Sequence, residues 1–142
     1  MRALIDTNII LDFFLTREPQ YEAAKKIFEL AYKSEINAYA TSSSITDIYY
    51  VTAKRIGDSA ARDALRNLFN LLAIITVDGE DCFTALDLPI KDYEDALVVA
   101  CAKKTDMDFI VTNDSAFLDA DNHTTRIISS AAFLQMLGED PR

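Results

Sequence analysis

The chain has 142 residues, 50% of them hydrophobic, with only three Gly and three Pro. This composition supports one folded domain with a substantial core and excludes a disordered tail, a disulfide-dependent miniprotein and a membrane-spanning helix. The formal net charge of −9, from 23 acidic and 14 basic side chains, excludes nucleic-acid binding by bulk positive charge.

Strand-like and helix-like segments alternate through the first half of the chain. In order, we expect a strand over 2–5 (RALI), helices over 8–15 and 19–34, a strand over 36–41 (INAYAT), and a helix over 42–56. The second helix carries apolar residues at helical spacing, and Gly57 is expected to end the third.

The alternation continues through the second half. We expect a helix from Asp58 or Ser59, a strand over 73–77 (AIITV), helices over 79–88 and 92–104, strands over 108–112 (DFIVT) and 126–129 (RIIS), and a final helix over 130–137. The helix over 92–104 is apolar almost all round, which predicts deep burial. Alternating strands and helices predict an α/β fold, with a central parallel sheet flanked by helices. Functional crevices in such folds lie outside the carboxyl ends of the strands.

Four acidic residues occupy equivalent places in this pattern. Asp6 follows the first strand, Asp47 lies in the helix after the second strand, and Asp114 follows DFIVT. Asp95 lies in the first turn of the helix that precedes DFIVT. Helices of a parallel α/β sheet run antiparallel to the strands, so helix starts and strand ends share one edge. We expect the four carboxylates to meet there.

Helix capping is the alternative role for these acids, because Asp is among the best N-cap residues. Three polar residues, Asp6, Thr7 and Asn8, stand where one cap would be enough. We expect Thr7 or Asn8 to cap the first helix. Ser44 and Asp92 are placed to cap the helices that carry Asp47 and Asp95, which would leave these two carboxylates free for another role.

Gathered carboxylates raise one another's pKa unless a cation lies between them. Oxygen ligands without Cys or His favour Mg²⁺ or Mn²⁺, and such ions commonly support phosphoryl chemistry. The pattern therefore predicts a metal-dependent phosphate or phosphodiester hydrolase. Zinc is disfavoured because His123 is the only histidine, and Cys82 and Cys101 lack metal-binding spacing.

Four segments in order carry a family resemblance: LIDTNIILDFF, SITDIYYV, DYEDALVVACAKK and DFIVTNDSAF. They resemble the PIN-domain family, compact Mg²⁺-dependent nucleases that include the VapC-like ribonuclease toxins, and the match spans nearly the whole chain. The resemblance implies one PIN-like domain over 1–142, a three-layer α/β/α sandwich, and an acidic pocket that holds Mg²⁺ or Mn²⁺. It implies metal-binding and catalytic roles for Asp6, Asp47, Asp95 and Asp114, with Asn8 and Thr112 in support. Asp92 is a further acid nearby, which we take as the helix cap, with a supporting role in the pocket as its alternative.

The function that the resemblance implies is endonucleolytic hydrolysis of single-stranded RNA. The VapC-like subtype further implies a toxin with an antitoxin protein as partner, a homodimer, and no membrane association. Because Asp6 interrupts the N-terminal apolar run, no secretory signal is recognised, and we expect a cytoplasmic location.

Two departures from the family pattern leave a second reading open. Asp47 stands where the family has the longer Glu, and Ala116 stands where a further acid is common. The alternative is a catalytically weak or inactive PIN domain that binds nucleic acid or protein. Haloacid-dehalogenase phosphatases are disfavoured because Asn8 replaces their second Asp, and receiver domains are disfavoured because no suitable Lys lies near Asp114.

Basic residues around the predicted turn at Gly57 are candidates for steering an RNA strand. They are Lys54, Arg55, Arg62 and Arg66, with Arg17 as a further candidate. Their alternative role is an ordinary solvated helix face.

Overall fold

The structure is a computed structural model that describes residues 1–120 and 125–140. Within them one sheet is formed by β1 (Arg2–Ile5), β2 (Asn37–Thr41), β3 (Leu72–Ile75), β4 (Phe109–Val111) and β5 (Arg126–Ile128). The strand order is β3-β2-β1-β4-β5, and every pairing is parallel. The predicted parallel sheet is confirmed, and each predicted strand is present with its ends within one or two residues.

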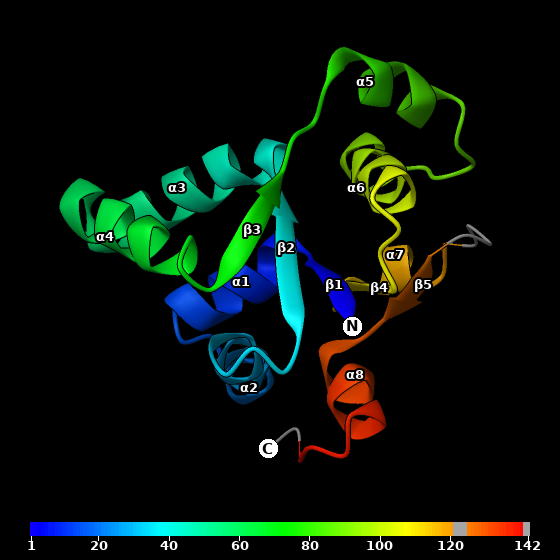
Figure 1. Ribbon diagram of the computed structural model, residues 1–142. Helices are drawn as coiled ribbons and strands as arrows, with labels where there is room; N and C mark the ends of the chain where they lie inside the picture. The colour runs from blue at the N-terminus through cyan, green and yellow to red at the C-terminus, as the bar shows by residue number, and fades with distance from the viewer. Residues whose placement is uncertain (121–124, 141–142) are drawn as a thin grey trace.

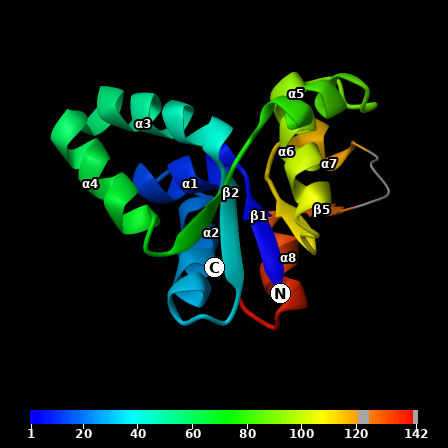
Figure 2. The ribbon, with the colours of Figure 1, turned by 45° about the horizontal axis from the view of Figure 1, so that its top comes forward.

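Helices cover the two faces of this sheet (Figures 1 and 2). The helices associated with one face are α1 (Thr7–Phe14), α2 (Tyr21–Tyr32), α3 (Ser42–Ile56), α4 (Asp58–Leu68) and α8 (Ser130–Met136). On the other face lie α6 (Tyr93–Lys104) and α7 (Ser115–Leu118), and α5 (Gly79–Leu86) packs on α6. This arrangement is the predicted α/β/α sandwich.

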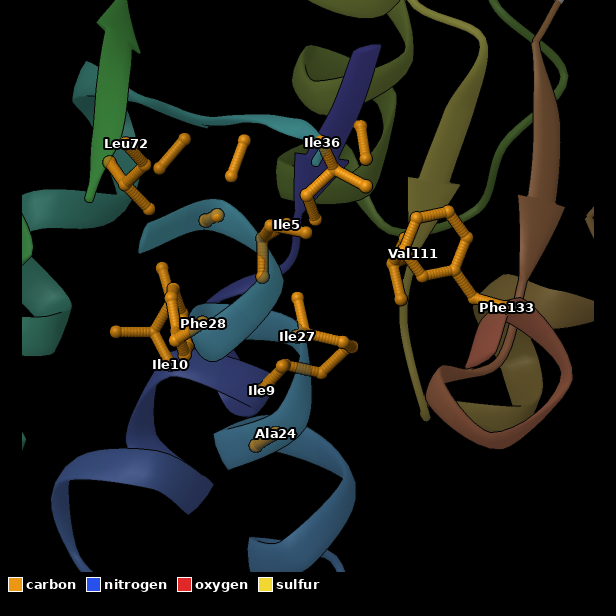
Figure 3. Close-up of a cluster of buried hydrophobic side chains, with 14 of the residues drawn as sticks. Ile5, Ile9, Ile10, Ala24, Ile27, Phe28, Ile36, Leu72, Val111 and Phe133 are labelled. Carbon is orange, nitrogen blue, oxygen red and sulfur yellow. The ribbon is translucent and has the colours of Figure 1, made fainter. Parts of the chain in front are cut away.

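Side-chain alternation along β1 divides the core between the two faces. Ala3 and Ile5 belong to the cluster beneath α1, α2 and α8, which Figure 3 shows, whereas Leu4 belongs to the cluster beneath α6. Successive residues of a strand point to opposite faces, so a strand covered on both faces reads as a continuous apolar run. The same burial from both sides fixes β1 at the centre of the sheet.

Several helices can be compared directly with their predictions. Residues 96–102 of α6 are all buried, as the apolar sequence of that helix predicted. Gly57 ends α3 with a φ of 91°, a conformation that glycine adopts without steric cost. The short helix α7 was not predicted, and His123 lies outside the described residues. None of the described helices is both long and apolar enough to cross a membrane.

Candidate active site

The site is built at the carboxyl ends of β1 and β4, which pair in register with Ile5 beside Val111. Asp6 follows β1 directly and is 9% exposed. Its Oδ1 accepts a hydrogen bond of 2.9 Å from the Thr7 backbone N–H, and its backbone is extended as an N-cap requires. Asp6 itself therefore caps α1. The prediction that Thr7 or Asn8 caps this helix was wrong, because the helix already begins at Thr7.

Thr112 connects Asp6 to Asp114. The Thr112 hydroxyl donates a hydrogen bond of 2.7 Å to Oδ2 of Asp6 and accepts one of 3.1 Å from the Asp114 backbone N–H. Asp114 in turn caps α7, with its Oδ1 accepting from the Ala116 N–H at 3.0 Å. Since Thr112 is fully buried, this link is held rigidly between the ends of two central strands.

The start of α6 brings Asp92 and Asp95 to the same edge. Asp92 is the N-cap, and its Oδ1 accepts a hydrogen bond of 3.1 Å from the Asp95 backbone N–H. The predicted capping role of Asp92 is therefore confirmed. The carboxylate of Asp95, one turn into the helix, has no capping role and is half-buried.

The start of α3 differs from its prediction. The helix begins at Ser42, and its N-cap is Thr41. Ser44, expected to be the cap, is buried inside the first turn, where its hydroxyl lies 2.8 Å from the Thr41 hydroxyl. The prediction was wrong because the end of β2 runs directly into the helix, so the cap falls on the last strand residue. Asp47 lies in the second turn and is exposed.

These elements surround one hollow of about 370 Å³, here called the acidic hollow. The residues that line it are Asp6, Thr7, Asn8, Leu11, Asp47, Tyr50, Val51, Asp92, Glu94, Asp95 and Asp114. Of the predicted site residues, only Thr112 does not line the hollow, and it acts from beneath through its hydrogen bond to Asp6. The structure thus brings the four predicted acids to a single place.

Glu94 is a site residue that the sequence analysis missed. It lines the acidic hollow, and although the residue is exposed, partial desolvation and the charges of Asp47, Asp6 and Asp92 raise its pKa. The signal was present in the sequence, because Glu94 directly precedes Asp95 in the first turn of α6. It was overlooked because acidic residues are common in first turns, where they complement the helix dipole.

Excess negative charge is the main electrostatic property of the hollow. Burial raises the pKa of Asp6, and the charges of Asp114 and Asp92 add to this, against hydrogen bonds from Thr112 and Thr7 that lower it. Burial and the neighbouring acids Asp92, Asp6, Asp114 and Glu94 raise the pKa of Asp95 to about 7. No Lys or Arg is among the described residues lining the hollow, so a proton or a bound cation must supply the compensating charge.

The donor set fits a hard divalent cation, since it offers several carboxylates and no nitrogen or sulfur ligand. The spacing is wider than a coordination sphere. Within residues 1–120 and 125–140, no group of three or more His, Cys, Asp or Glu side chains is placed so that it could hold a metal ion. The carboxylates would have to close in around an ion, a movement that their mutual repulsion opposes until a cation neutralises them.

Three of the basic residues considered for RNA steering are engaged elsewhere. Arg62 pairs with Asp58 at 2.8 Å and Arg66 with Asp63 at 2.7 Å, both on the exposed surface of α4. Arg17 lies 3.9 Å from Asp12. Neither these three nor Lys54 and Arg55 line the acidic hollow.

Comparison with known proteins adds to this picture. A family model described as PIN domain matches residues 2–116. Ribonuclease VapC1 from Aquifex aeolicus (strain VF5) is 27% identical over 125 residues, which cover 84% of this chain and 86% of that protein.

Similar solved structures include VapBC2 from Rickettsia felis bound to a DNA fragment from its promoter, with a TM-score of 0.69 and 18% identity. The match covers 91% of this chain and 98% of that one. VapC20 from Mycobacterium tuberculosis, a sarcin-ricin loop cleaving toxin, has a TM-score of 0.66 at 15% identity, covering 81% of this chain and 92% of that one. At these identities the structures share the fold.

Proposed function

This chain belongs to the PIN-domain family, and we propose that it is a metal-dependent endoribonuclease that hydrolyses phosphodiester bonds of single-stranded RNA. We also take residues 1–142 as one PIN-like domain. The observation that carries the proposal is the gathering of Asp6, Asp47, Asp95 and Asp114 around one hollow at the carboxyl edge of the sheet. The 27% identity to a ribonuclease over most of both chains supports the same reaction class.

Asp6, Asp95 and Asp114 would hold Mg²⁺ or Mn²⁺, because they come from the two central strands and from the helix start facing them. When bound, such an ion polarises a phosphate oxygen and lowers the pKa of a coordinated water. Asn8 lines the same hollow and can offer a neutral oxygen or an amide donor to the substrate.

The protein's own contribution is positioning and proton handling. Thr112 fixes the orientation of Asp6 through its 2.7 Å hydrogen bond. Asp95, with a pKa of about 7, holds a proton for part of the time at neutral pH and releases it when positive charge arrives. Asp47 on α3 and Glu94 on α6 also line the hollow, and in this proposal they would orient the attacking water or a second ion.

A toxin role with a protein partner is the finer part of the proposal. The relatives carry VapC names, and one solved structure is a VapBC complex on promoter DNA. By analogy we propose an antitoxin protein as a partner of this chain, a homodimeric state, and action in the cytoplasm.

The second candidate is a catalytically weak PIN domain that acts as a binding module for nucleic acid or protein. Two features favour it: the short side chain of Asp47 and the spacing of the carboxylates, which is too wide to hold an ion as they stand. Measured cleavage would decide between the two functions.

The test compares the wild-type protein with Asp6→Asn on single-stranded RNA in Mg²⁺ or Mn²⁺, and then in EDTA. We expect cleavage by the wild type with either ion and none in EDTA. We expect Asp6→Asn to lower kcat by about a hundredfold or more, because a metal ligand contributes several kcal/mol. Asp106→Asn, at an exposed position of the opposite sheet edge, is the matched control. An RNA cleavage rate that is unchanged both by EDTA and by Asp6→Asn would overturn the assignment.

A further inference from the structure

A second hollow opens directly beside the acidic one. It has a volume of about 530 Å³, and Asp92 and Asp95 line both hollows, so they form the wall between them. Its other sides come from the turn before α6 and from α7 with the two residues after it. Most of this surface is apolar, from Pro89, Ile90, Ala116, Phe117 and Ala120, and Lys91 and Asp119 add one charge of each sign. We call it the side hollow.

We propose that the side hollow binds the nucleoside next to the scissile phosphate, with its base against the apolar wall. This inference rests on the proposed function. A strand whose phosphate lies at Asp95 in the acidic hollow has its next nucleoside across the shared wall, because only Asp92 and Asp95, which line both hollows, stand between the two spaces. Proteins that bind single-stranded RNA take splayed bases against apolar and aromatic surfaces.

The side hollow suits a base because of its chemistry. Three of its lining residues are apolar and differ in exposure: Phe117 is 1% exposed, Ile90 is half-buried and Pro89 is exposed. Ala116, on the first turn of α7, is exposed and lines the opening. The methyl group at position 116 leaves room in the hollow that a longer side chain would fill.

Lys91 brings a positive charge to the side hollow, next to the acidic hollow, which has none in its lining. It lines the side hollow, is exposed, and immediately precedes Asp92. No other Lys or Arg is among the described residues lining either hollow. Lys91 forms no ion pair within the described part of the chain, unlike Arg62 and Arg66. We therefore assign to Lys91 the contact with the phosphate of the bound nucleoside, which offsets the repulsion from the neighbouring acids.

The first test fills the side hollow with Ala116→Leu. The matched control is Ala131→Leu, at the second position of α8, where the alanine is also exposed but lines neither hollow. On a single-stranded RNA oligonucleotide in Mg²⁺, we expect Ala116→Leu to raise KM by about tenfold, the scale of one lost base contact, with kcat retained. The control should leave KM unchanged.

The second test removes the ligand group instead. After the cleavage position is mapped, each base near it is deleted in turn by an abasic nucleotide, and KM is measured for the wild type and Ala116→Leu. At one position beside the scissile bond, base deletion should raise KM for the wild type and cause no further rise for Ala116→Leu. The proposal would be overturned if base deletion raised KM by the same factor in Ala116→Leu as in the wild type. It would also be overturned if Ala116→Leu left KM unchanged.

Lys91→Ala probes the phosphate contact, with Lys103→Ala on the last turn of α6 as its control. We expect Lys91→Ala to raise KM several-fold and to lessen the salt dependence of KM by about one unit of log–log slope. An unchanged salt slope would contradict the assigned contact. The absence of RNA cleavage by the wild type itself, in Mg²⁺ and in Mn²⁺, would instead overturn the proposed function on which the side hollow's role depends.

Discussion

Thr112, at the end of β4, donates a hydrogen bond of 2.7 Å from its hydroxyl to Oδ2 of Asp6, at the end of β1. The two strands are adjacent and in register, so the bond crosses directly between neighbouring strand ends. Both residues are buried. The orientation of the most deeply buried acid in the site is therefore set by a side chain from the central sheet, and the capping bond to Thr7 holds the other oxygen.

Thr112→Val removes the hydroxyl while keeping the shape of the side chain. We expect a loss of about 10- to 100-fold in Mg²⁺ affinity or in kcat/KM, the usual effect of deleting a group that orients a metal ligand. The variant should also lose about 1–3 kcal/mol of unfolding free energy, because a buried Asp6 oxygen is left without its donor. Calorimetric Mg²⁺ titration and urea unfolding measure the two effects.

Thr112→Ser is the control for this prediction, since serine restores the hydroxyl and deletes only a methyl group. We expect it to recover most of the metal affinity. Full activity in Thr112→Val would show that Asp6 needs no support from β4, and the link would then be structural only.

The positions of the strands and acids follow from the sequence because burial on both faces demands continuous apolar runs. RALI and DFIVT are mostly apolar, which predicts central strands of the sheet. An acid that follows such a strand then lies at the carboxyl edge of the sheet. The four predicted acids reach one hollow for this reason.

Local features were harder to predict. The helix α7 has only four residues, which is too short to show a helical period. Ser44 and Thr41 both resemble caps, and only the observed end of β2 decides between them. Asp6 caps α1 through Oδ1 and accepts from the Thr112 hydroxyl through Oδ2 while it lines the hollow, and no sequence pattern encodes the directions of these two oxygens. The side hollow was not predicted because its lining comes from two segments about 25 residues apart in the sequence. Its apolar residues look like ordinary core residues in the sequence.

Glu94→Gln tests the acid that the sequence analysis overlooked. We expect it to lower kcat at least about tenfold while the fold is retained, because it removes a carboxylate from the hollow without removing its bulk. Glu80→Gln, in the exposed first turn of α5, is the matched control and should have no effect. Cleavage assays at saturating RNA provide the measurement. Equal rates for Glu94→Gln and the wild type would restrict the catalytic set to the four aspartates.

Asp47→Glu restores the side-chain length that is usual in the family. Asp47 is exposed on α3 and near enough to Glu94 for its charge to raise the pKa of that residue. One added methylene brings the carboxylate closer to the other acids, so we expect Mg²⁺ binding to tighten by several-fold. We also expect Glu94→Gln to lower kcat less in the Asp47→Glu protein than in the wild type, because the longer side chain at position 47 can take over part of the role of Glu94. Independent, multiplying effects of the two substitutions would refute a shared role.

Asp95 makes the stability of the metal-free protein depend on pH. Its pKa is about 7 in the folded state, against an ordinary value of 3.8. Between these values the folded state binds a proton that the unfolded state does not, so the free energy of unfolding falls as pH rises from about 4 to about 7. Burial and the neighbouring acids shift the pKa of Asp6 and Glu94 in the same direction, which adds to the slope.

Asp95→Asn should therefore flatten the dependence of Tm on pH in EDTA and raise Tm at pH 8 above that of the wild type, because a repelled charge is removed. Mg²⁺ at pH 8 should give the wild type the higher Tm of the two. The cation binds the ionised Asp95 carboxylate of the wild type more tightly than the amide of Asp95→Asn, so it stabilises the wild type more. Thermal unfolding followed by circular dichroism, at pH 5 and pH 8 with and without Mg²⁺, measures both effects. Asp106→Asn, far from the hollow, should reproduce the wild-type profile. A lower Tm for Asp95→Asn in EDTA at pH 8 would mean that the Asp95 carboxylate stabilises the fold, contrary to the repulsion inferred from its neighbours.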